Sequence, residues 1–240
     1  MMGLSSLALA SILSFTTLST AHSNHVYHAH TQQSTIDALG LTTNGIPYPT
    51  RAHWMRIANQ ALILSPTPCQ FGAFAAAIVN HTSSDGLGDL ICTGTNGNAR
   101  TGNPTHHGEM VAINNCTTIL TDPSGSYNFT PFEAAAAFQD LTLYTNAESC
   151  PMCASAIRWA GFKEYVYGTS IERLIETGWG QINISSVEVV ERSWGLGTST
   201  RVVAEVLTNE TDPWFLWQYQ PKYPCPHECT RNERGVCSLV

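Results

Sequence analysis

The chain of 240 residues carries few charged side chains and very little lysine. Charged residues make up 12% of it, the formal net charge is −7, and lysine occurs only at Lys163 and Lys222. A protein that binds a nucleic-acid polymer needs a basic face to neutralise phosphates. No basic stripe is present, so we expect no nucleic-acid polymer among the partners.

Long apolar runs are also missing, apart from one at the N-terminus. Residues 4–18, "LSSLALASILSFTTL", are uncharged, but they are too short and too rich in Ser and Thr to span a bilayer well. Small residues follow at Ser19 and Ala21, as in a signal-peptidase site, although no Lys or Arg precedes the run. We predict a signal peptide over residues 1–21, a secreted protein, and no membrane association after cleavage.

Glycosylation sequons support export. Five N-x-[ST] sequons are present, and five in one chain with a signal peptide fit a glycoprotein. They begin at Asn80, Asn115, Asn128, Asn183 and Asn209. Asn115 lies in a predicted helix near the candidate site, so we expect that sequon to be the least used.

The rest of the chain suits one domain behind a short arm. Residues 22–35, "HSNHVYHAHTQQST", are polar and His-rich. We interpret them as a flexible arm, which could also bind a transition metal weakly. Residues 36–240 have the length of a single domain with a sizeable core, and they end in an aromatic, cysteine-bearing tail from Pro213 on. No internal repeat is visible.

Strand and helix patterns alternate along this domain, which predicts an α/β sheet covered on both faces. Thr50 is a plausible N-cap for the first helix, and Thr130 to Glu133 match a capping box. We predict helices over residues 50–64, 105–120, 131–138, 150–160 and 171–178, and strands over residues 71–79, 87–95, 141–146 and 164–169. Asp85-Gly86 predicts the turn between the first two strands.

The stretch "NAESCPMCASAIRWAG", residues 146–161, places Cys150 and Cys153 at the start of a predicted helix. In an exported chain such a pair could be a disulfide, a redox pair or part of a metal site. A helix start puts both sulfurs on one turn, and its free N–H groups and dipole favour thiolates. The choice depends on whether other metal ligands exist.

The stretch "HHGE", residues 106–109, supplies them. A catalytic zinc site uses three protein ligands and leaves one position open, and it needs a proton carrier that is not a ligand. His107 would be the third ligand and Glu109 the proton carrier. His106 should project away from them, although it is the nearby candidate for the fourth ligand of a structural zinc site. A dithiol oxidoreductase has no use for the His-x-Glu helix, so the two motifs together favour catalytic zinc.

These motifs resemble those of the cytidine deaminase-like superfamily, and within it the cytidine/deoxycytidylate-type zinc deaminases. "NPTHHGEMVAI" resembles the family's zinc and proton-shuttle helix. "LTLYTNAESCPMCASAIRWA" resembles its strand and cysteine helix, and "GTN" at 94–96 its substrate-binding Asn. The resemblance covers roughly residues 50–180.

The resemblance implies a three-layer α/β/α sandwich with a mixed five-stranded sheet. It implies Zn²⁺ held by His107, Cys150 and Cys153, with Glu109 as general acid and base. Asn96 would contact the substrate. Relatives are often dimers, so a homodimer is a further expectation.

Two positions depart from the family pattern. Gly108 stands where the family usually has Ala, which costs some helix propensity. Ser149 stands where it usually has Pro, which could loosen that turn or add a hydrogen bond. Neither change removes a reacting group.

The substrate is expected to be a small-molecule nucleobase or nucleoside that loses its amino group as ammonia. "CPMC" followed by "AI" and "WA" resembles the guanine deaminase-like branch most, so a guanine-type purine comes first. Trp159 could line the pocket, although a Trp at helical spacing is more often a core residue. A cytosine or cytidine deaminase, an inactive binding module of the same fold, and a metal carrier using the His-rich arm are the alternatives.

Six further cysteines remain, and an even number in an exported chain predicts up to three disulfides. Six cysteines allow 15 pairings, among which sequence cannot choose. Cys225, Cys229 and Cys237 lie in the tail, so at least one bond should attach the tail to the core or to itself. Cys92 and Cys116 lie in apolar stretches and could equally be buried thiols.

Overall fold

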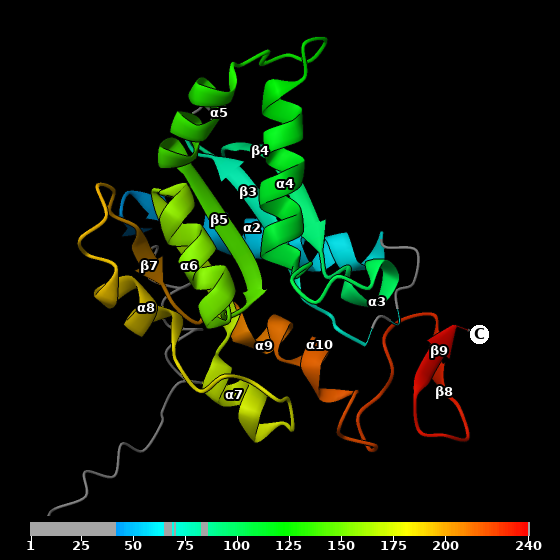
Figure 1. The fold of residues 1–240 in the computed structure, drawn as a ribbon. Coiled ribbons are helices and arrows are strands. Elements are labelled where there is room, and N and C mark those ends of the chain that lie inside the picture. The colour runs from blue at the N-terminus through cyan, green and yellow to red at the C-terminus, as the bar shows by residue number, and fades with distance from the viewer. Residues whose placement is uncertain (1–41, 65–68, 70, 83–85, 240) are drawn as a thin grey trace, which may run out of the picture.

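A computed structural model describes residues 42–64, 69, 71–82 and 86–239 (Figure 1). The predicted signal peptide, the His-rich arm and Asp85 of the predicted turn lie outside these residues. Among the described helices, none is both long and apolar enough to cross a membrane.

The centre of the molecule is a mixed five-stranded sheet, as the resemblance implies. The strand order is β4-β3-β5-β6-β7, with β3 antiparallel to both of its neighbours and β6 parallel to both of its own. The strands are β3 (Ala75–Asn80), β4 (Asp89–Thr95), β5 (Leu141–Ala147), β6 (Glu164–Thr169) and β7 (Arg201–Val203). This order places the ends of β4 and β5 near each other, on either side of β3.

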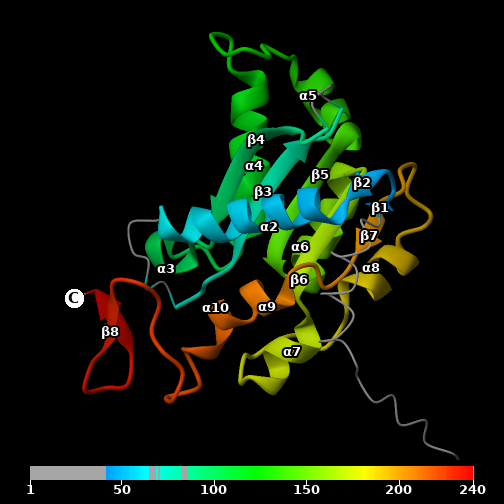
Figure 2. The same ribbon diagram turned by 180° about the vertical axis from the view of Figure 1, so that it is seen from behind.

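Helices cover both faces of the sheet. In Figure 1, α4 (Gly108–Thr121) and α6 (Pro151–Ala160) lie side by side over one face, flanked by α5 (Pro131–Ala137) and α8 (Ser186–Arg192). Figure 2 shows α2 (Tyr48–Ile63) crossing the opposite face. The predicted three-layer α/β/α sandwich is therefore confirmed.

The remaining elements are short. They are β1 (Thr42–Thr43), β2 (Ile46–Pro47), α3 (Asn98–Thr101), η1 (Phe138–Asp140), α7 (Ile171–Glu176), α9 (Thr208–Thr211), α10 (Pro213–Leu216), β8 (Cys229–Arg231) and β9 (Cys237–Leu239). The β8–β9 hairpin, red in Figure 1, lies at the edge of the molecule.

The apolar run of β3 is continuous because both of its faces are buried. Ala75 through Val79 have no exposed surface. Ala76 and Ile78 pack into a cluster with α4 and α6, whereas Val79 packs into the cluster under α2. β3 begins at Ala75, whereas the sequence predicts a strand from Phe71. Residues 71–74 form an irregular segment before it.

Two helix starts differ from the predicted ones. α2 begins at Tyr48, not after Thr50, because Pro49 suits a first turn whose N–H groups have no intrahelical partner. α4 begins at Gly108, not near Thr105, because His107 is extended with φ −73° and ψ 161°. The capping box at Thr130 is confirmed, with the Thr130 hydroxyl and the Glu133 carboxylate each bonding the other's backbone N–H.

Close contact between α4 and the sheet accounts for Gly108. A Cβ at this position would lie 2.9 Å from the Phe74 carbonyl oxygen, and one at Gly94 of β4 would lie 2.2 Å from the Ala112 nitrogen. The absence of both side chains lets the first turn of α4 rest directly on β3 and β4. The departure from the family's Ala is therefore a packing feature beside the candidate site.

Three disulfides join the six cysteines outside the Cys-x-x-Cys pair. Cys92 bonds Cys116 and fastens β4 to α4, so these two are not free thiols. Cys225 bonds Cys237 within the tail, and Cys69 bonds Cys229 between the tail and the main domain. Cys150 and Cys153 are both free.

Candidate metal and catalytic site

The predicted ligands His107, Cys150 and Cys153 come together at the starts of α4 and α6. Both Sγ atoms lie 3.6 Å from the His107 Nδ1, and the three ligand atoms lie within 4.8 Å of one another. In tetrahedral zinc coordination a sulfur and a nitrogen ligand are about 3.6 Å apart, given the usual bond lengths. The residues present therefore fit one zinc ion with an open fourth position.

Helix ends place these ligands. Cys150 is the N-cap of α6 and His107 the N-cap of α4, and both have extended backbone. Cys153 lies one turn into α6 and is fully buried. The positive ends of two helix dipoles thus point at the sulfurs, which favours the thiolate form that a metal needs.

The two thiols share a proton in the metal-free chain. The hydrogen bond from the Cys153 thiol, with help from His107, lowers the pKa of Cys150 to about 4, while the neighbouring Cys150 sulfur and burial raise the pKa of Cys153 well above its usual range. Hydrogen bonding to Cys150 raises the pKa of His107. A divalent cation would replace the shared proton and relieve the repulsion between two thiolates.

Glu109 lies one residue beyond the start of α4 and is 5% exposed. Burial raises the pKa of its carboxyl group, and a hydrogen bond from Ser149 opposes that shift. The Ser149 hydroxyl donates to Glu109 Oε1 over 2.7 Å. One carboxylate oxygen of Glu109 is thereby fixed.

A backbone hydrogen bond holds Ser149 in place. Its backbone N–H donates to the Tyr165 hydroxyl over 2.6 Å, and both residues have no exposed surface. A proline at this position could not make that bond, because it has no N–H. The departure from the family's Pro therefore adds two hydrogen bonds at the turn that carries Cys150.

A cavity of about 470 Å³ opens beside His107, Glu109 and Cys150. Its lining combines aromatic side chains with a few polar ones, as is usual in sites for small molecules. The other lining residues are Phe71, Gly72, Phe74, Asn96, Asn98, Ala99, Glu148, Trp179, Gly180, Gln181 and Ile182. Asn96, predicted to contact the substrate, therefore lies in the right place to do so.

Asn96 is positioned by the loop around it. Its Oδ1 accepts from the Asn98 N–H, and its backbone N–H donates to the Phe74 carbonyl. A Cβ at Gly72 would lie 2.5 Å from the Asn96 Nδ2. Gly72 thus leaves the space that the Asn96 amide occupies.

Trp159 is not part of this cavity. Its side chain is 77% exposed on α6, so within one chain it is neither a pocket residue, as predicted, nor a core residue. The indole that lines the cavity is Trp179, which follows α7 and is 9% exposed. No periodicity around Trp179 marks it, because it lies in an irregular segment whose path depends on tertiary packing.

Glu148 is a second buried carboxylate that sequence reasoning did not single out. Its Oε1 accepts from the Ser186 N–H and hydroxyl, and its Oε2 accepts from the Ile171 N–H. These bonds attach the starts of α7 and α8 to the end of β5. Its place directly before Ser149 and Cys150 was the one available signal.

Comparison with known proteins agrees with this geometry. Residues 49–169, half of the chain, match the model of the cytidine and deoxycytidylate deaminase zinc-binding region. Guanine deaminase of Bacillus subtilis is 33% identical over 107 residues, which are 45% of this chain and 56% of that protein. A probable cytosine deaminase of Schizosaccharomyces pombe is 45% identical over 38 residues, 16% of this chain and 24% of that protein. The matches thus cover less than two thirds of either relative.

Solved structures share the fold. A mutant of the protein NE0047 in complex with 8-azaguanine has a TM-score of 0.53 and 20% identity, covering 71% of this chain and 85% of the other. NE0047 in complex with 2,6-diaminopurine has a TM-score of 0.50 and 19% identity, covering 78% and 88%. At this identity the likeness shows a common fold.

Proposed function

Because the chain belongs to the cytidine and deoxycytidylate deaminase family, we propose that it is a zinc-dependent hydrolase that releases ammonia from a free nucleobase or nucleoside. The observation that carries the proposal is the convergence of His107, Cys150 and Cys153 on one point, with Glu109 beside it at a cavity. An inactive module of this fold would be expected to lack one of these groups.

The reaction replaces a ring amino group by oxygen, consuming water and releasing ammonia. Zinc, when bound, makes hydroxide available near pH ~7. The chain's own part is proton transfer, in two steps. Glu109 would take one proton from the attacking water and deliver it to a ring nitrogen, then take the second and deliver it to the departing amino group, while Ser149 holds Oε1. Asn96, which also lines the cavity, would orient the base.

A guanine-type purine is the preferred substrate in this proposal. The similarity to a guanine deaminase and the fold shared with a protein solved with 8-azaguanine and 2,6-diaminopurine support it. The apolar wall formed by Phe71, Phe74 and Trp179 suits a flat bicyclic ring. Cytosine is the alternative, supported by the shorter match to a probable cytosine deaminase.

We further propose that the protein works outside the reducing cytosol, as a secreted glycoprotein. Three disulfides in one chain support this location. The Asn115 amide donates to the Thr93 carbonyl, which supports the expectation that this sequon is the least used.

The test of the proposal pairs metal analysis with a substrate panel. Wild-type protein should contain about one zinc per chain, and it should release ammonia from guanine faster than from adenine, cytosine or their nucleosides. Glu109→Gln should keep the zinc and lose activity by about 10²–10⁴-fold, the usual contribution of a general acid–base group.

Three outcomes would count against the proposal. Metal-free pure protein, or a Cys150–Cys153 disulfide found by peptide mapping, would remove the metal site. Absence of ammonia from every base and nucleoside in the panel would favour the binding module instead.

A further inference from the structure

Phe71 forms part of the cavity wall, although it lies in an irregular segment before β3 and is 47% exposed. A side chain in such a segment has no regular hydrogen-bond ladder to hold it. Its ring contacts Trp179 at a centroid distance of 5.5 Å, Tyr219 at 5.6 Å and Trp217 at 6.3 Å. Trp217 and Tyr219 belong to the C-terminal tail, defined here as residues 213–239.

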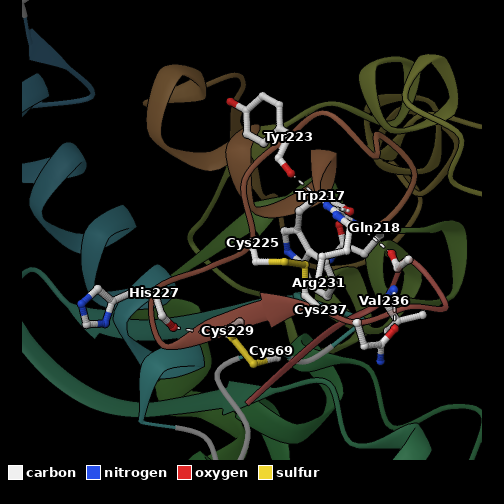
Figure 3. Close-up of a disulfide and its surroundings, with 12 residues drawn as sticks. Cys69, Trp217, Gln218, Tyr223, Cys225, His227, Cys229, Arg231, Val236 and Cys237 are labelled. Carbon is white, nitrogen blue, oxygen red and sulfur yellow. Dashed lines mark hydrogen bonds between the residues drawn. A yellow bond between two sulfur atoms is a disulfide. The ribbon is translucent and has the colours of Figure 1, made fainter. Parts of the chain in front are cut away.

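The C-terminal tail also holds the backbone around Phe71 at two points. The Gln218 side-chain amide donates to the Phe71 carbonyl over 3.0 Å. Two residues earlier in the chain, Cys69 is bonded to Cys229. Figure 3 shows Gln218 and the Cys69–Cys229 bond. A hydrogen bond and a covalent bond thus attach Phe71 and Cys69 of the main domain to the tail.

Gln218 and Cys229, the two tail residues that attach to the main domain, are linked by hydrogen bonds within the tail. Arg231, at the end of β8, donates through its guanidinium to the Trp217, Tyr223 and Gly235 carbonyls, over 3.1, 2.8 and 2.6 Å. Figure 3 shows the Arg231 side chain directed toward Trp217 and Tyr223. Three hydrogen bonds from the Arg231 side chain thus hold together the parts of the tail that carry Gln218 and Cys229.

The same aromatic cluster includes a second residue of the cavity lining, Trp179. Trp179 contacts Tyr219 at 5.2 Å and Phe74 at 5.2 Å, and its indole N–H donates to the Phe215 carbonyl over 2.9 Å. The tail therefore supports both Phe71 and Trp179, which line the cavity.

We propose that the C-terminal tail supports the substrate site from outside, and that Gln218 and the Cys69–Cys229 bond hold Phe71 in place as part of the cavity lining. The substrate half of this inference rests on the proposed function. The tail lies beyond residues 49–169, which match the family, so the device belongs to this chain rather than to the matched region.

Preorganisation is the physical basis. If the tail did not hold Phe71, the ordering of its segment would have to be supplied when the base binds, and affinity would fall. In the described part of the chain, the side-chain hydrogen bonds of Glu109 and of the predicted zinc ligands involve Ser149, His107, Cys150 and Cys153, and not the tail. The attachments should therefore affect KM and the dissociation constant and leave kcat and zinc content largely unchanged.

The test compares two disulfide variants of the full chain. Cys69→Ala/Cys229→Ala removes the attachment to Phe71, and Cys225→Ala/Cys237→Ala removes the tail's internal bond and is the matched control. In the first variant the KM for guanine and the dissociation constant of 8-azaguanine should rise about tenfold, equivalent to ~1.4 kcal/mol. In the control variant the KM and the dissociation constant should each change less than about twofold. In either variant, kcat and zinc content should also change less than about twofold. Gln218→Ala, which keeps every disulfide, should give an intermediate rise.

Amide hydrogen exchange over residues 71–80 provides a readout that needs no substrate. Exchange there should be faster in the Cys69→Ala/Cys229→Ala variant than in the control variant. Equal exchange in the two variants would overturn the proposal that the tail holds Phe71. Faster exchange with an unchanged 8-azaguanine dissociation constant would overturn the proposal that Phe71 belongs to the substrate site. If wild-type protein neither deaminates guanine nor binds 8-azaguanine, the proposed function fails, and exchange still decides whether the tail holds Phe71.

Discussion

Ser149 and Gly108 are small residues next to Glu109 and the predicted zinc ligands. The contact that explains each of these small residues does not follow from the sequence. The Ser149 hydroxyl reaches Glu109, and Gly108 rests against the Phe74 carbonyl. Both contacts join segments that are far apart in the chain. The family pattern marks both positions as departures, but it does not show which contact each small residue makes.

Removal of the Ser149 hydroxyl should slow the reaction without loss of metal. Ser149→Ala frees Glu109 Oε1, and a hydrogen bond to a charged group contributes about 1.5–3 kcal/mol. We expect kcat to fall about tenfold or more, with KM and zinc content unchanged. Ser149→Thr keeps a hydroxyl and should recover part of the rate. A parallel loss of zinc in Ser149→Ala would instead show that the residue acts through Cys150.

His81 should make stability depend on pH. Its Nε2 lies 2.9 Å from the Tyr144 hydroxyl, and the Leu87 carbonyl accepts a hydrogen bond from the ring. Burial, with the Arg51 charge, lowers the pKa of His81 in the folded chain. The unfolded chain takes up a proton below pH ~6.5 and the folded chain does so only at lower pH, so stability is lost as pH falls through this range.

Urea unfolding of wild type and His81→Gln at pH 7.5 and 5.5 measures this effect. The urea midpoint of the wild type should fall more between the two pH values than that of the variant. Equal falls would mean that His81 does not contribute to the pH dependence.

At the scale of elements, a buried ion pair joins α2 to the sheet. Arg51 Nη1 lies 2.6 Å from Glu164 Oε2, and both side chains are at most 3% exposed. The Asn44 amide donates to Glu164 Oε1, and Arg51 Nη2 donates to the Thr43 carbonyl, so the β1–β2 hairpin joins the same network. The pair links the start of β6 to an element more than a hundred residues earlier.

Loss of one partner of this pair should cost more than loss of both. Glu164→Gln leaves a buried guanidinium without its counter-charge, which typically costs about 3–5 kcal/mol of unfolding free energy. Arg51→Met/Glu164→Leu removes both charges and should cost clearly less. Urea unfolding of the two variants at pH 7 decides, and a larger loss in the double variant would contradict the expected desolvation penalty.

Elements with strong local signals could be predicted from the sequence. The apolar run of β3, the capping box of α5 and the Cys-x-x-Cys start of α6 each carry their own pattern, and all three are found. Helix starts set by prolines or packing, as in α2 and α4, were misplaced by a few residues. The candidate ligands His107, Cys150 and Cys153 could be singled out because each motif is local, and the structure brings them together. Trp179 and Phe71, in contrast, reach the cavity through contacts between distant segments.

At the scale of the whole molecule, the predicted zinc ligands lie where α4 and α6 begin, so a bound metal should also contribute to stability. A ligand that binds the folded state and not the unfolded chain stabilises it by about 2.7 kcal/mol at a hundred times its dissociation constant. A chelator that strips zinc should therefore lower Tm and abolish activity. Re-addition of zinc should restore both, and an unchanged Tm would mean that the metal does not couple these helices.

Disulfide pairing is the feature of the whole molecule that the sequence left open. Cys92 and Cys116 pair because Gly94 and Gly108 bring α4 onto β4, a distance that no spacing rule gives. The tail cysteines divide between an internal bond and a bond to the main domain, because the tail packs beside Phe71.

The Cys69–Cys229 bond spans 160 residues of sequence and so turns most of the described chain into a covalent ring. A protease that severs a single peptide bond at any loop inside that ring leaves both fragments joined through sulfur. Such nicked molecules would migrate as one species on a non-reducing gel and separate after reduction. The bond thus gives the protein a means to survive hydrolytic surroundings in one piece.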